Sequence, residues 1–333
     1  MQKKLFVAAV LLALLPAVFA QPAPKVTCDR ACLEKYIDQY LDAMLAHKVN
    51  PELFARTCRF TENGVELPLG GEGLWYSMSG KGTYKFYIPD IETQQVAFIG
   101  TVKEGGAAPG AKTAPGAKPA MPTTVAVAIR LKILNGLITE AEQLAIRPEQ
   151  SLSGSAPASK FPPTGEAVEK MGAPHPIFTE AIPEAERLSR EDLVRIGNYY
   201  FAGLQRNDGK GYYPFTDDAV RFENGSMACG LDREGKLIPK ACKKQFESGL
   251  EGIVSRIRDR RFVAVDRERG IAFAFGFFDH VRINWTWQLA ELFKIEKGNI
   301  RRIEAVFHRC PYGMNAGWST YEQGMSEELQ SIR

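Results

Sequence analysis

The sequence contains an internal repeat, and this repeat constrains the fold more than any other feature. Arg59-Phe60 recurs 162 residues later as Arg221-Phe222, and Lys132-Ile133 recurs at the same distance as Lys294-Ile295. Three more positions keep this spacing, namely Gly136, Ile138 and Glu142, which match Gly298, Ile300 and Glu304. Matches spread this widely at one offset indicate a duplicated domain. The 333 residues are enough for two domains of ordinary size.

Each half is expected to begin with a helix and to continue as an antiparallel sheet. Apolar residues recur every three or four positions from Leu33 to Leu45 and from Leu193 to Leu204, which is the spacing of an amphipathic helix. Strand-like runs follow, QVAFIGTV and TTVAVAIRLKIL in the first half and GIAFAFGFF and TWQLAELFKI in the second. Asn-Gly and Lys-Gly-Asn turns join them to the last strands, LITEAEQLAI and NIRRIEAVFH. This order predicts an α+β unit in each half.

Residues 1–20 predict export. Two lysines precede an apolar run from Leu5 to Leu15, and small residues end the segment at Ala20, as in a cleaved secretory signal peptide. A membrane anchor is the alternative, but the run is too short to span a bilayer. Without the segment, 40 basic residues face 39 acidic ones, so we expect neither a nucleic-acid partner nor membrane association after cleavage. The expected location is periplasmic or secreted.

The repeats are expected at residues 28–147 and 187–310. A Gly/Ala/Pro-rich stretch at 105–122 interrupts the first repeat and predicts a flexible insertion between two strands. Residues 148–186 are expected to connect the repeats, and 311–333 to form a C-terminal tail.

Six cysteines follow the predicted signal peptide, and an even number in an exported chain favours disulfides. Cys229 and Cys242 flank the polar stretch GLDREGKLIPKA and are the expected pair. Cys28 and Cys32 have CxxxC spacing, but no histidine or second close cysteine pair accompanies them, which disfavours a zinc site. The pairing of the other four cysteines stays open.

The order of these elements resembles the SnoaL-like members of the nuclear transport factor 2-like superfamily, and DDAVRFENG resembles their first-strand segment. The segments CDRACLEKYIDQYLDAMLAHK, RFTENGVELPLGGEGLW, ELFKIEKGNIRRIEAVF and PYGMNAGW resemble exported tandem-repeat proteins of a domain-of-unknown-function family. The resemblance implies two cone-shaped domains that pair within one chain as a pseudo-dimer. Further oligomerisation stays open.

The resemblance also implies a small apolar or aromatic ligand in the cone. The implied reaction is that of a cofactor-independent lyase, dehydratase or isomerase with a Glu or His base. The competing interpretation is a non-catalytic binding or interaction protein, because the superfamily includes both. Nucleophile-elbow, P-loop, dinucleotide and HExxH motifs are all lacking from the sequence, so we expect no cofactor and no metal.

Glu223 is the first candidate base, because related isomerases place a carboxylate in the first-strand segment. Those relatives have Asp-Pro where this chain has Glu-Asn, and a surface or turn-capping carboxylate is the alternative. Tyr199 and Tyr200 lie on the opening helix, which supplies a hydrogen-bonding tyrosine in the relatives. Arg221 and Glu62 complete the candidate ligand-binding residues of the two first-strand segments.

Asp279 and His280 end the aromatic strand FAFGFFDH and are further catalytic candidates, with a structural histidine as the alternative. His308 shares one strand face with Glu304. The two side chains could form an acid/base pair, or this face could be the outer or interface face of the sheet. The second interpretation is favoured, because the opposite face of the strand is apolar. Trp285 and Trp287 share a face and are candidate ligand contacts, although most C-terminal aromatics are expected in the core and at the seam between repeats.

RFTENG becomes RFENG in the second half, one residue shorter. Loss of one residue flips later side chains across a sheet unless a bulge absorbs it. If Phe60 and Phe222 both face the core, only one of Glu62 and Glu223 can face inward with its Phe. The two pockets are therefore expected to differ chemically.

Overall fold

The computed structural model describes residues 27–106, 121–148, 162–206, 208–249 and 254–330. The predicted signal peptide and most of the predicted insertion lie outside these residues. Of the helices described, none is long and apolar enough to cross a lipid bilayer.

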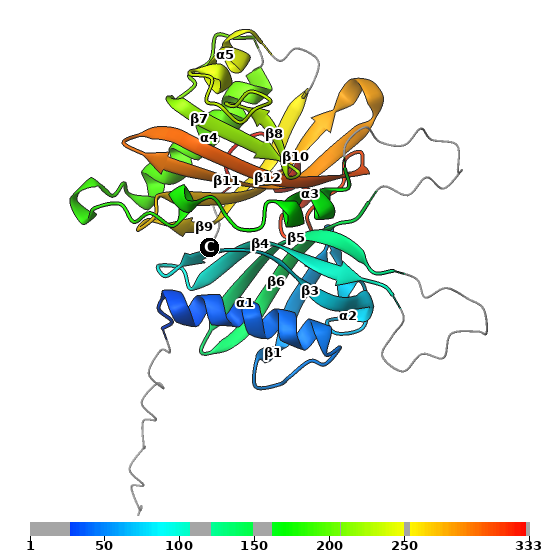
Figure 1. The fold of residues 1–333 in the computed structure, drawn as a ribbon. Helices are drawn as coiled ribbons and strands as arrows, with labels where there is room; N and C mark the ends of the chain where they lie inside the picture. Colours follow the sequence, from blue (N-terminus) through cyan, green and yellow to red (C-terminus); the bar gives the residue numbers. More distant parts are fainter. Residues whose placement is uncertain (1–26, 107–120, 149–161, 207, 250–253, 331–333) are drawn as a thin grey trace, which may run out of the picture.

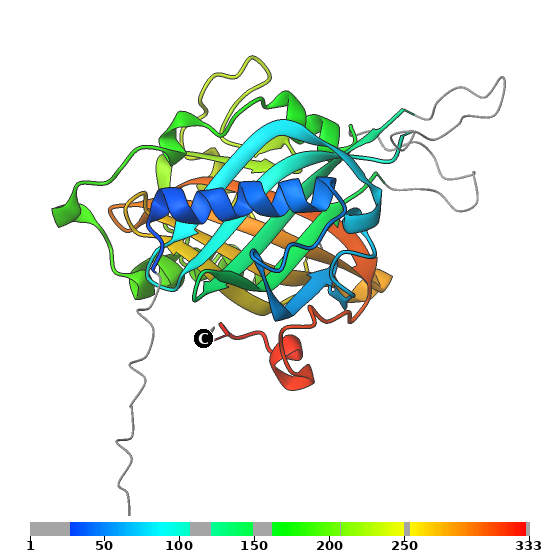
Figure 2. The same ribbon diagram turned by 90° about the horizontal axis from the view of Figure 1, so that it is seen from below.

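Residues 30–146 form the first cone, in which helix α1 lies across the concave face of a six-stranded sheet (Figures 1 and 2). Its elements are α1 (Arg30–Leu45), β1 (Phe54–Glu62), β2 (Val65–Glu66), α2 (Leu74–Ser77), β3 (Met78–Asp90), β4 (Gln95–Glu104), β5 (Thr123–Leu134) and β6 (Leu137–Ile146). The strand order is β2-β1-β6-β5-β4-β3. The Asp29 side chain accepts a hydrogen bond from the Cys32 backbone and starts α1, whose apolar stripe packs on the sheet.

Residues 190–311 form the second cone, which repeats this order. Its elements are α4 (Arg190–Arg206), β7 (Phe215–Glu223), β8 (Ser226–Cys229), α5 (Ala241–Glu247), β9 (Arg256–Asp266), β10 (Ile271–His280), the 3-10 turn η3 (Val281–Ile283), β11 (Trp285–Glu296) and β12 (Asn299–Pro311). The strand order is β8-β7-β12-β11-β10-β9, the same as in the first cone. The predicted tandem α+β fold is therefore confirmed.

Both sheets are mixed, whereas the sequence predicted antiparallel sheets. The first long strand of each cone runs parallel to the last, β1 beside β6 and β7 beside β12. A parallel neighbour needs a long crossover connection, and here the intervening helix and strands supply it. The other strand pairs in each sheet are antiparallel.

The two sheets pack face to face through an apolar layer, so the chain forms the expected pseudo-dimer (Figure 1). Both cones contribute to this layer, the first through Phe86, Ile99, Ala128 and Leu144 and the second through Ala264, Phe273, Phe275 and Leu292. Ion pairs related by the pseudo-twofold axis flank it. Arg30 of α1 binds Asp266 of β9 at 2.7 Å, and Arg190 of α4 binds Asp90 of β3 at 2.6 Å. The first residue of each cone's opening helix thus forms an ion pair with the edge strand of the other cone.

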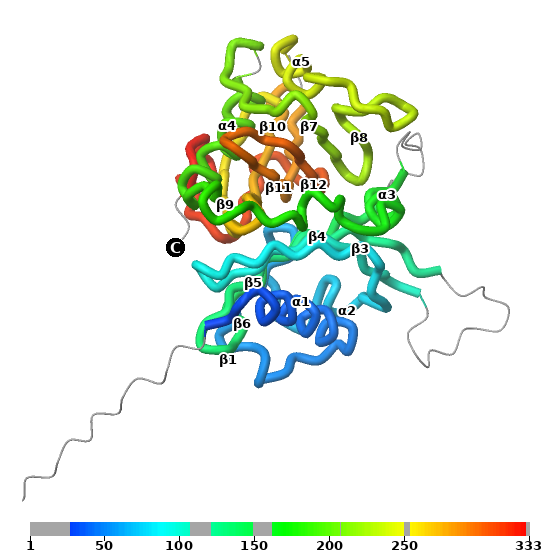
Figure 3. The backbone as a smooth tube through the Cα atoms, turned by 60° about the vertical axis from the view of Figure 1, so that its left-hand side comes forward, coloured from blue at the N-terminus to red at the C-terminus, as the bar shows by residue number. Residues whose placement is uncertain are grey.

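The segment after each sheet packs on its own cone and also reaches the opposite one. The connection carries α3 (Thr164–Lys170), η1 (Pro176–Phe178) and η2 (Glu184–Glu186), and the tail carries α6 (Tyr321–Met325) beside β9 (Figures 2 and 3). A Cβ on Gly225 would lie 2.5 Å from the Ala167 backbone, and one on Gly64 would lie 2.6 Å from the Asn315 carbonyl oxygen. Each Asn-Gly turn is therefore covered by the segment that leaves the other cone.

Candidate functional site

Strand register places two residues of RFENG inside the second cone. Strand β7 pairs with β12 so that Glu223 lies opposite Ala305. Alternation then turns Arg221 and Glu223 toward the helices and Phe222 toward the first cone. The Phe222 ring lies there 4.9 Å from the Arg302 guanidinium. The premise that both repeated Phe residues face a core is therefore wrong.

Arg221 is the centre of a buried polar cluster. Its guanidinium donates to the Tyr200 hydroxyl at 3.0 Å and to the Gln245 side-chain oxygen at 2.8 Å. Its Nε lies 3.3 Å from a Glu223 carboxylate oxygen, and its charged group stacks 5.6 Å from the Phe246 ring centre. Only 6% of Arg221 is exposed. A positive charge is thus fixed inside the cone by three elements, α4, β7 and α5.

Glu291 brings a second carboxyl group to this cluster. It lies on β11 opposite Ala305 and is 2% exposed. Burial and, next, the negative charge of Glu223 raise the pKa of Glu291 to about 8, against the opposing charge of Arg221 and a hydrogen bond with Tyr200. A carboxyl group with this pKa exchanges its proton near neutral pH. The sequence-based prediction included Tyr200, Arg221 and Glu223 but missed Glu291 and Gln245.

The cluster opens toward solvent at Glu223, whose side chain is 34% exposed. Half-buried aromatic rings continue the concave face beyond it. Trp287 stacks on Phe307 with ring centres 5.0 Å apart, and His280 packs edge-on against Trp287 at 4.4 Å. Trp285 lies 6.2 Å from Trp287. We call this part of the second cone, with Glu223, Trp285, Trp287 and Phe307, its mouth. There the Glu223 carboxylate lies on the same concave face as the aromatic rings.

The helix end of the same cone is closely packed with rings. The ring centres of Tyr200 and Phe246, and those of Tyr200 and Phe293, lie 5.3 Å apart, and Phe201 and Phe293 lie 5.5 Å apart. These contacts fix the Tyr200 hydroxyl beside Arg221. Side chains therefore fill the helix end of this cone.

The first cone has its own inward-facing carboxylate, Glu62, but that group is fully engaged. It accepts hydrogen bonds from the Leu74 backbone at 2.8 Å, the Gln143 amide at 2.8 Å and the Arg147 guanidinium at 2.7 Å. Gln143 in turn accepts from the Tyr40 hydroxyl at 2.7 Å. This network holds α2 on the sheet, so Glu62 has a structural part in the first cone. Both Glu62 and Glu223 face inward, contrary to the sequence-based expectation.

Asp279 is buried in an ion-pair network on the opposite face of β10 from His280. Although burial opposes its ionisation, hydrogen bonds from Arg258, Thr286 and Arg256 lower its pKa. The distances are 2.8 Å to Arg258 and 2.7 Å to Thr286. Such a carboxylate stays ionised and paired, and its face turns it away from Glu291.

His308 and Tyr199 also lie away from the cluster. His308 shares the interface face with Glu304, contacts the Gln288 side chain at 3.1 Å, and has its pKa lowered to about 4 by burial. Glu304 accepts a hydrogen bond from Tyr84 of the first cone at 2.8 Å. The ring of Tyr199 packs instead against Tyr212 on the outer side of α4, at 5.1 Å.

A disulfide joins Cys229 to Cys242, as the sequence predicted, with a sulfur–sulfur distance of 1.98 Å. It ties β8 to α5, the helix that carries Gln245 of the cluster. A second disulfide joins Cys28 to Cys32, while Cys58 and Cys310 are free thiols. In the part of the chain that the structure describes, no group of three or more His, Cys, Asp or Glu side chains is arranged to hold a metal ion.

Comparisons with known proteins match one segment of the chain to a family without an assigned activity. Residues 186–307 match a family described as a domain of unknown function, DUF8021. The cluster of Tyr200, Arg221, Glu223 and Glu291 lies inside that segment. The chain is also similar to an NTF2-like protein of unknown function from Shewanella baltica OS155, at 15% identity and a TM-score of 0.24, over 36% of this chain and 93% of that one. No curated protein matches the sequence.

Proposed function

We propose that the second cone binds a small molecule and transfers a proton on it without a cofactor, as a lyase, dehydratase or isomerase does. The observation that carries the proposal is the buried Glu291 carboxyl, with a pKa of about 8, beside Arg221 and Tyr200. A general base or acid works best when its pKa is near the working pH. A strongly perturbed carboxyl among charged partners is also a frequent mark of a functional site.

The neighbours of Glu291 have complementary parts in such a step. When Glu291 takes a proton from a carbon of the ligand, the electron pair left behind forms an anion. Arg221 stabilises that anion by its charge, and the Tyr200 hydroxyl does so as a donor, since burial keeps its pKa well above the ordinary value. The proton then returns to another atom, or a leaving group departs. Glu223 at the mouth is a second group able to carry the proton to water.

The half-buried rings of Trp287 and Phe307 favour an apolar or aromatic ligand, since they leave flat faces beside the carboxylates. The resemblance to SnoaL-like domains supports a ligand in the cone. We also propose that the chain is exported, since its two disulfides suit an oxidising compartment.

A non-catalytic binding or interaction protein is the second candidate function. The ring packing of Tyr200, Phe246 and Phe293 favours it, because side chains fill the helix end of the cone. In this case Glu291 would contribute to recognition of a ligand at the mouth without proton transfer.

A ligand screen and a pH profile test the proposal. Thermal shifts of the mature protein with a fractionated metabolite extract identify a ligand, because binding raises stability by mass action. Turnover of that ligand is expected to rise with pH toward the Glu291 pKa of about 8 and to fall at least about 100-fold in Glu291→Gln. The matched control is Glu62→Gln in the first cone, which should leave turnover unchanged. Binding without turnover, weakened in Glu291→Gln, would establish the second candidate function.

A further inference from the structure

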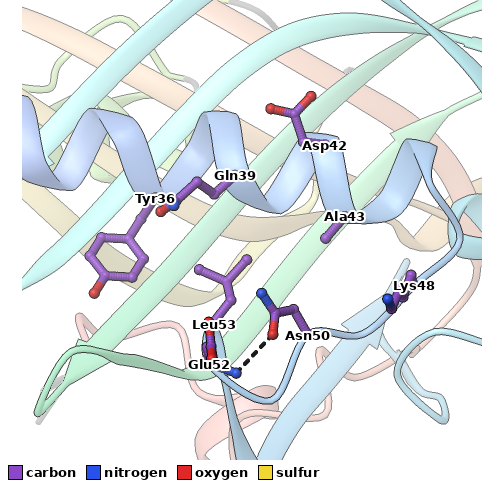
Figure 4. Close-up of a pocket in the computed structure, with 8 residues that line it drawn as sticks. All are labelled: Tyr36, Gln39, Asp42, Ala43, Lys48, Asn50, Glu52 and Leu53. Carbon is purple, nitrogen blue, oxygen red and sulfur yellow. Dashed lines mark hydrogen bonds between the residues drawn. The ribbon is translucent and has the colours of Figure 1, made fainter.

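A hollow of about 450 Å³ lies on the outside of the first cone, between α1 and the turn that leads into β1 (Figure 4). Tyr36, Gln39 and Ala43 of the helix form one side, and Asn50 and Leu53 of the turn form the other. The volume is within the range of about 300–1,000 Å³ that small-molecule sites occupy. This hollow is separate from the second cone and its carboxylates.

Its walls are held in place before any ligand arrives. The Tyr36 hydroxyl donates to the Gly136 carbonyl at 2.7 Å, which fixes the phenol ring. The Asn50 side chain accepts from the Glu52 backbone at 3.0 Å, and the Asn50 carbonyl accepts from the Leu53 backbone at 3.0 Å. These bonds fix the Tyr36 ring and the shape of the turn, which form two of the walls.

The lining offers hydrogen bonds without a net charge. Asp42 is paired with Lys81 and projects from another side of the helix (Figure 4). Within the described residues, the side chains of Gln39, Lys48 and Glu52 make no hydrogen bond or ion pair to the protein. One positive and one negative charge therefore remain, together with an amide that both donates and accepts. This balance favours a neutral ligand with many hydroxyl groups.

The second cone provides an internal comparison. When α1 and α4 are aligned on their inward-facing tyrosines, Tyr40 and Tyr200, the residue of α4 that corresponds to Gln39 is Tyr199. Tyr199 packs edge-on against Tyr212 of the following turn, so two rings occupy the place of the hollow. The connection from helix to strand has the same length in both cones. The open groove of the first cone is thus a feature of its side chains and not of the fold.

We propose that this hollow binds a neutral polyhydroxylated ring, that is, a monosaccharide or the terminal sugar of a glycan. The apolar floor of Ala43 and Leu53 and the ring of Tyr36 contact the carbon–hydrogen faces of such a ring. Gln39 and Glu52 meet its hydroxyl groups as donor and acceptors. The site is open to solvent, so the expected Kd is on the order of 1 mM.

Amide-resolved NMR titration of the full mature chain tests this proposal. The probes are glucose, galactose and N-acetylglucosamine, each as the free sugar and as its methyl glycoside. Saturable shifts are expected at the backbone amides of Gln39, Ala43 and Asn50 with at least one probe. Tighter binding of the glycosides would identify a glycan end as the ligand, and tighter binding of the free sugars a monosaccharide.

Closing the hollow supplies the decisive variant. Gln39→Tyr combined with Pro51→Tyr reproduces the ring pair of the second cone, and binding should fall at least about tenfold while the melting temperature is kept. The control Tyr199→Gln, made in the second cone, should leave sugar binding unchanged. Absence of saturable shifts in the hollow with every probe, or equal binding by the closed variant, would overturn the proposal. Neither result bears on the carboxylates of the second cone.

Discussion

Replacing Glu291 by Gln is expected to stabilise the protein, and more so as the pH rises. Burial and the charge of Glu223 raise the folded-state pKa of Glu291 from 4.5 to about 8. Between these values the unfolded chain has released a proton that the folded protein still holds. Stability is therefore fully present below pH 4.5 and falls by about 1.4 kcal/mol for each pH unit up to the folded pKa.

The accumulated cost is about 3 kcal/mol at neutral pH and about 5 kcal/mol above the folded pKa. Gln has nearly the same shape, keeps a partner for the Tyr200 hydroxyl and carries no charge, so Glu291→Gln removes this cost. A carboxyl group with a raised pKa inside a cone is thus expected to lower stability at neutral pH.

Urea unfolding at several pH values measures the effect. The free energy of unfolding of the variant and the natural protein should agree near pH 4.5 and diverge steadily above it. The control is Glu142→Gln at the seam, where Arg261 binds the Glu142 carboxylate at 2.6 and 2.9 Å. That change leaves Arg261 with the Asp259 carboxylate at 3.2 Å as its ion-pair partner and should destabilise by up to about 3–5 kcal/mol. A Glu291→Gln variant that is less stable at high pH, or equally shifted at every pH, would refute the reasoning.

Three further changes test the fold around the site. Arg190→Ala leaves the buried Asp90 carboxylate without its ion pair and should lower the free energy of unfolding by about 3 kcal/mol, measured in urea; no loss would show the pair to be neutral. Trp318→Ala removes a ring held between two guanidinium groups at 4.6 Å each, and should make the tail sensitive to limited proteolysis at a cost of about 1–3 kcal/mol. Selective reduction of Cys229–Cys242 opens a loop of 13 residues and should lower the free energy of unfolding by about 3 kcal/mol, measured by thermal unfolding. Reduction of Cys28–Cys32 opens a shorter loop and should cost less, so a larger cost for that disulfide would contradict this reasoning.

Much of the fold could be predicted because its strands and helices follow simple periodicities. The opening helices, the central hairpins and the 162-residue repeat all appear in the structure. Strand β9, RIRDRRFVAVD, was missed, because four consecutive charged residues indicate an exposed segment. They are buried because other strands supply partners: Arg261 meets Glu142 of the other cone, and Arg258 meets Asp279 of the neighbouring strand β10. Long-range ion pairs of this kind leave no mark in the local sequence.

Part of the site was within reach of the sequence. Trp285 and Trp287 were predicted to share a strand face, and the same alternation carried along TWQLAELFKI puts Glu291 on it. A carboxylate at an inward position of an apolar strand is the available sign of a perturbed group. Gln245 left no such sign, since the short helix α5 is placed by the Cys229–Cys242 disulfide and not by its own periodicity.

The Arg-Phe pairs of RFTENG and RFENG align in the sequence, but in the structure the equivalent positions are shifted by one residue. In strand register, Phe60 lies opposite Ala141 and Arg221 lies opposite Ile303, so the arginine of the second phrase takes the position of the phenylalanine of the first. Phe60 packs in the first core. The Asn-Gly turns stay in register, because each Asn side chain pairs with the backbone of the last strand of its cone.

The two cones therefore differ chemically through replacement at equivalent positions rather than through a flipped strand. Glu62 and Glu223 both face inward, but the pair Ile129 and Gln143 of the first cone becomes Glu291 and Ala305 in the second. Glu291 in place of Ile129 supplies the acid with the raised pKa. Ala305 in place of Gln143 removes the amide that binds Glu62 in the first cone. With Arg221 in place of a phenylalanine, the same fold changes from an interior that locks its carboxylate to one that buries an acid with a raised pKa near a guanidinium group.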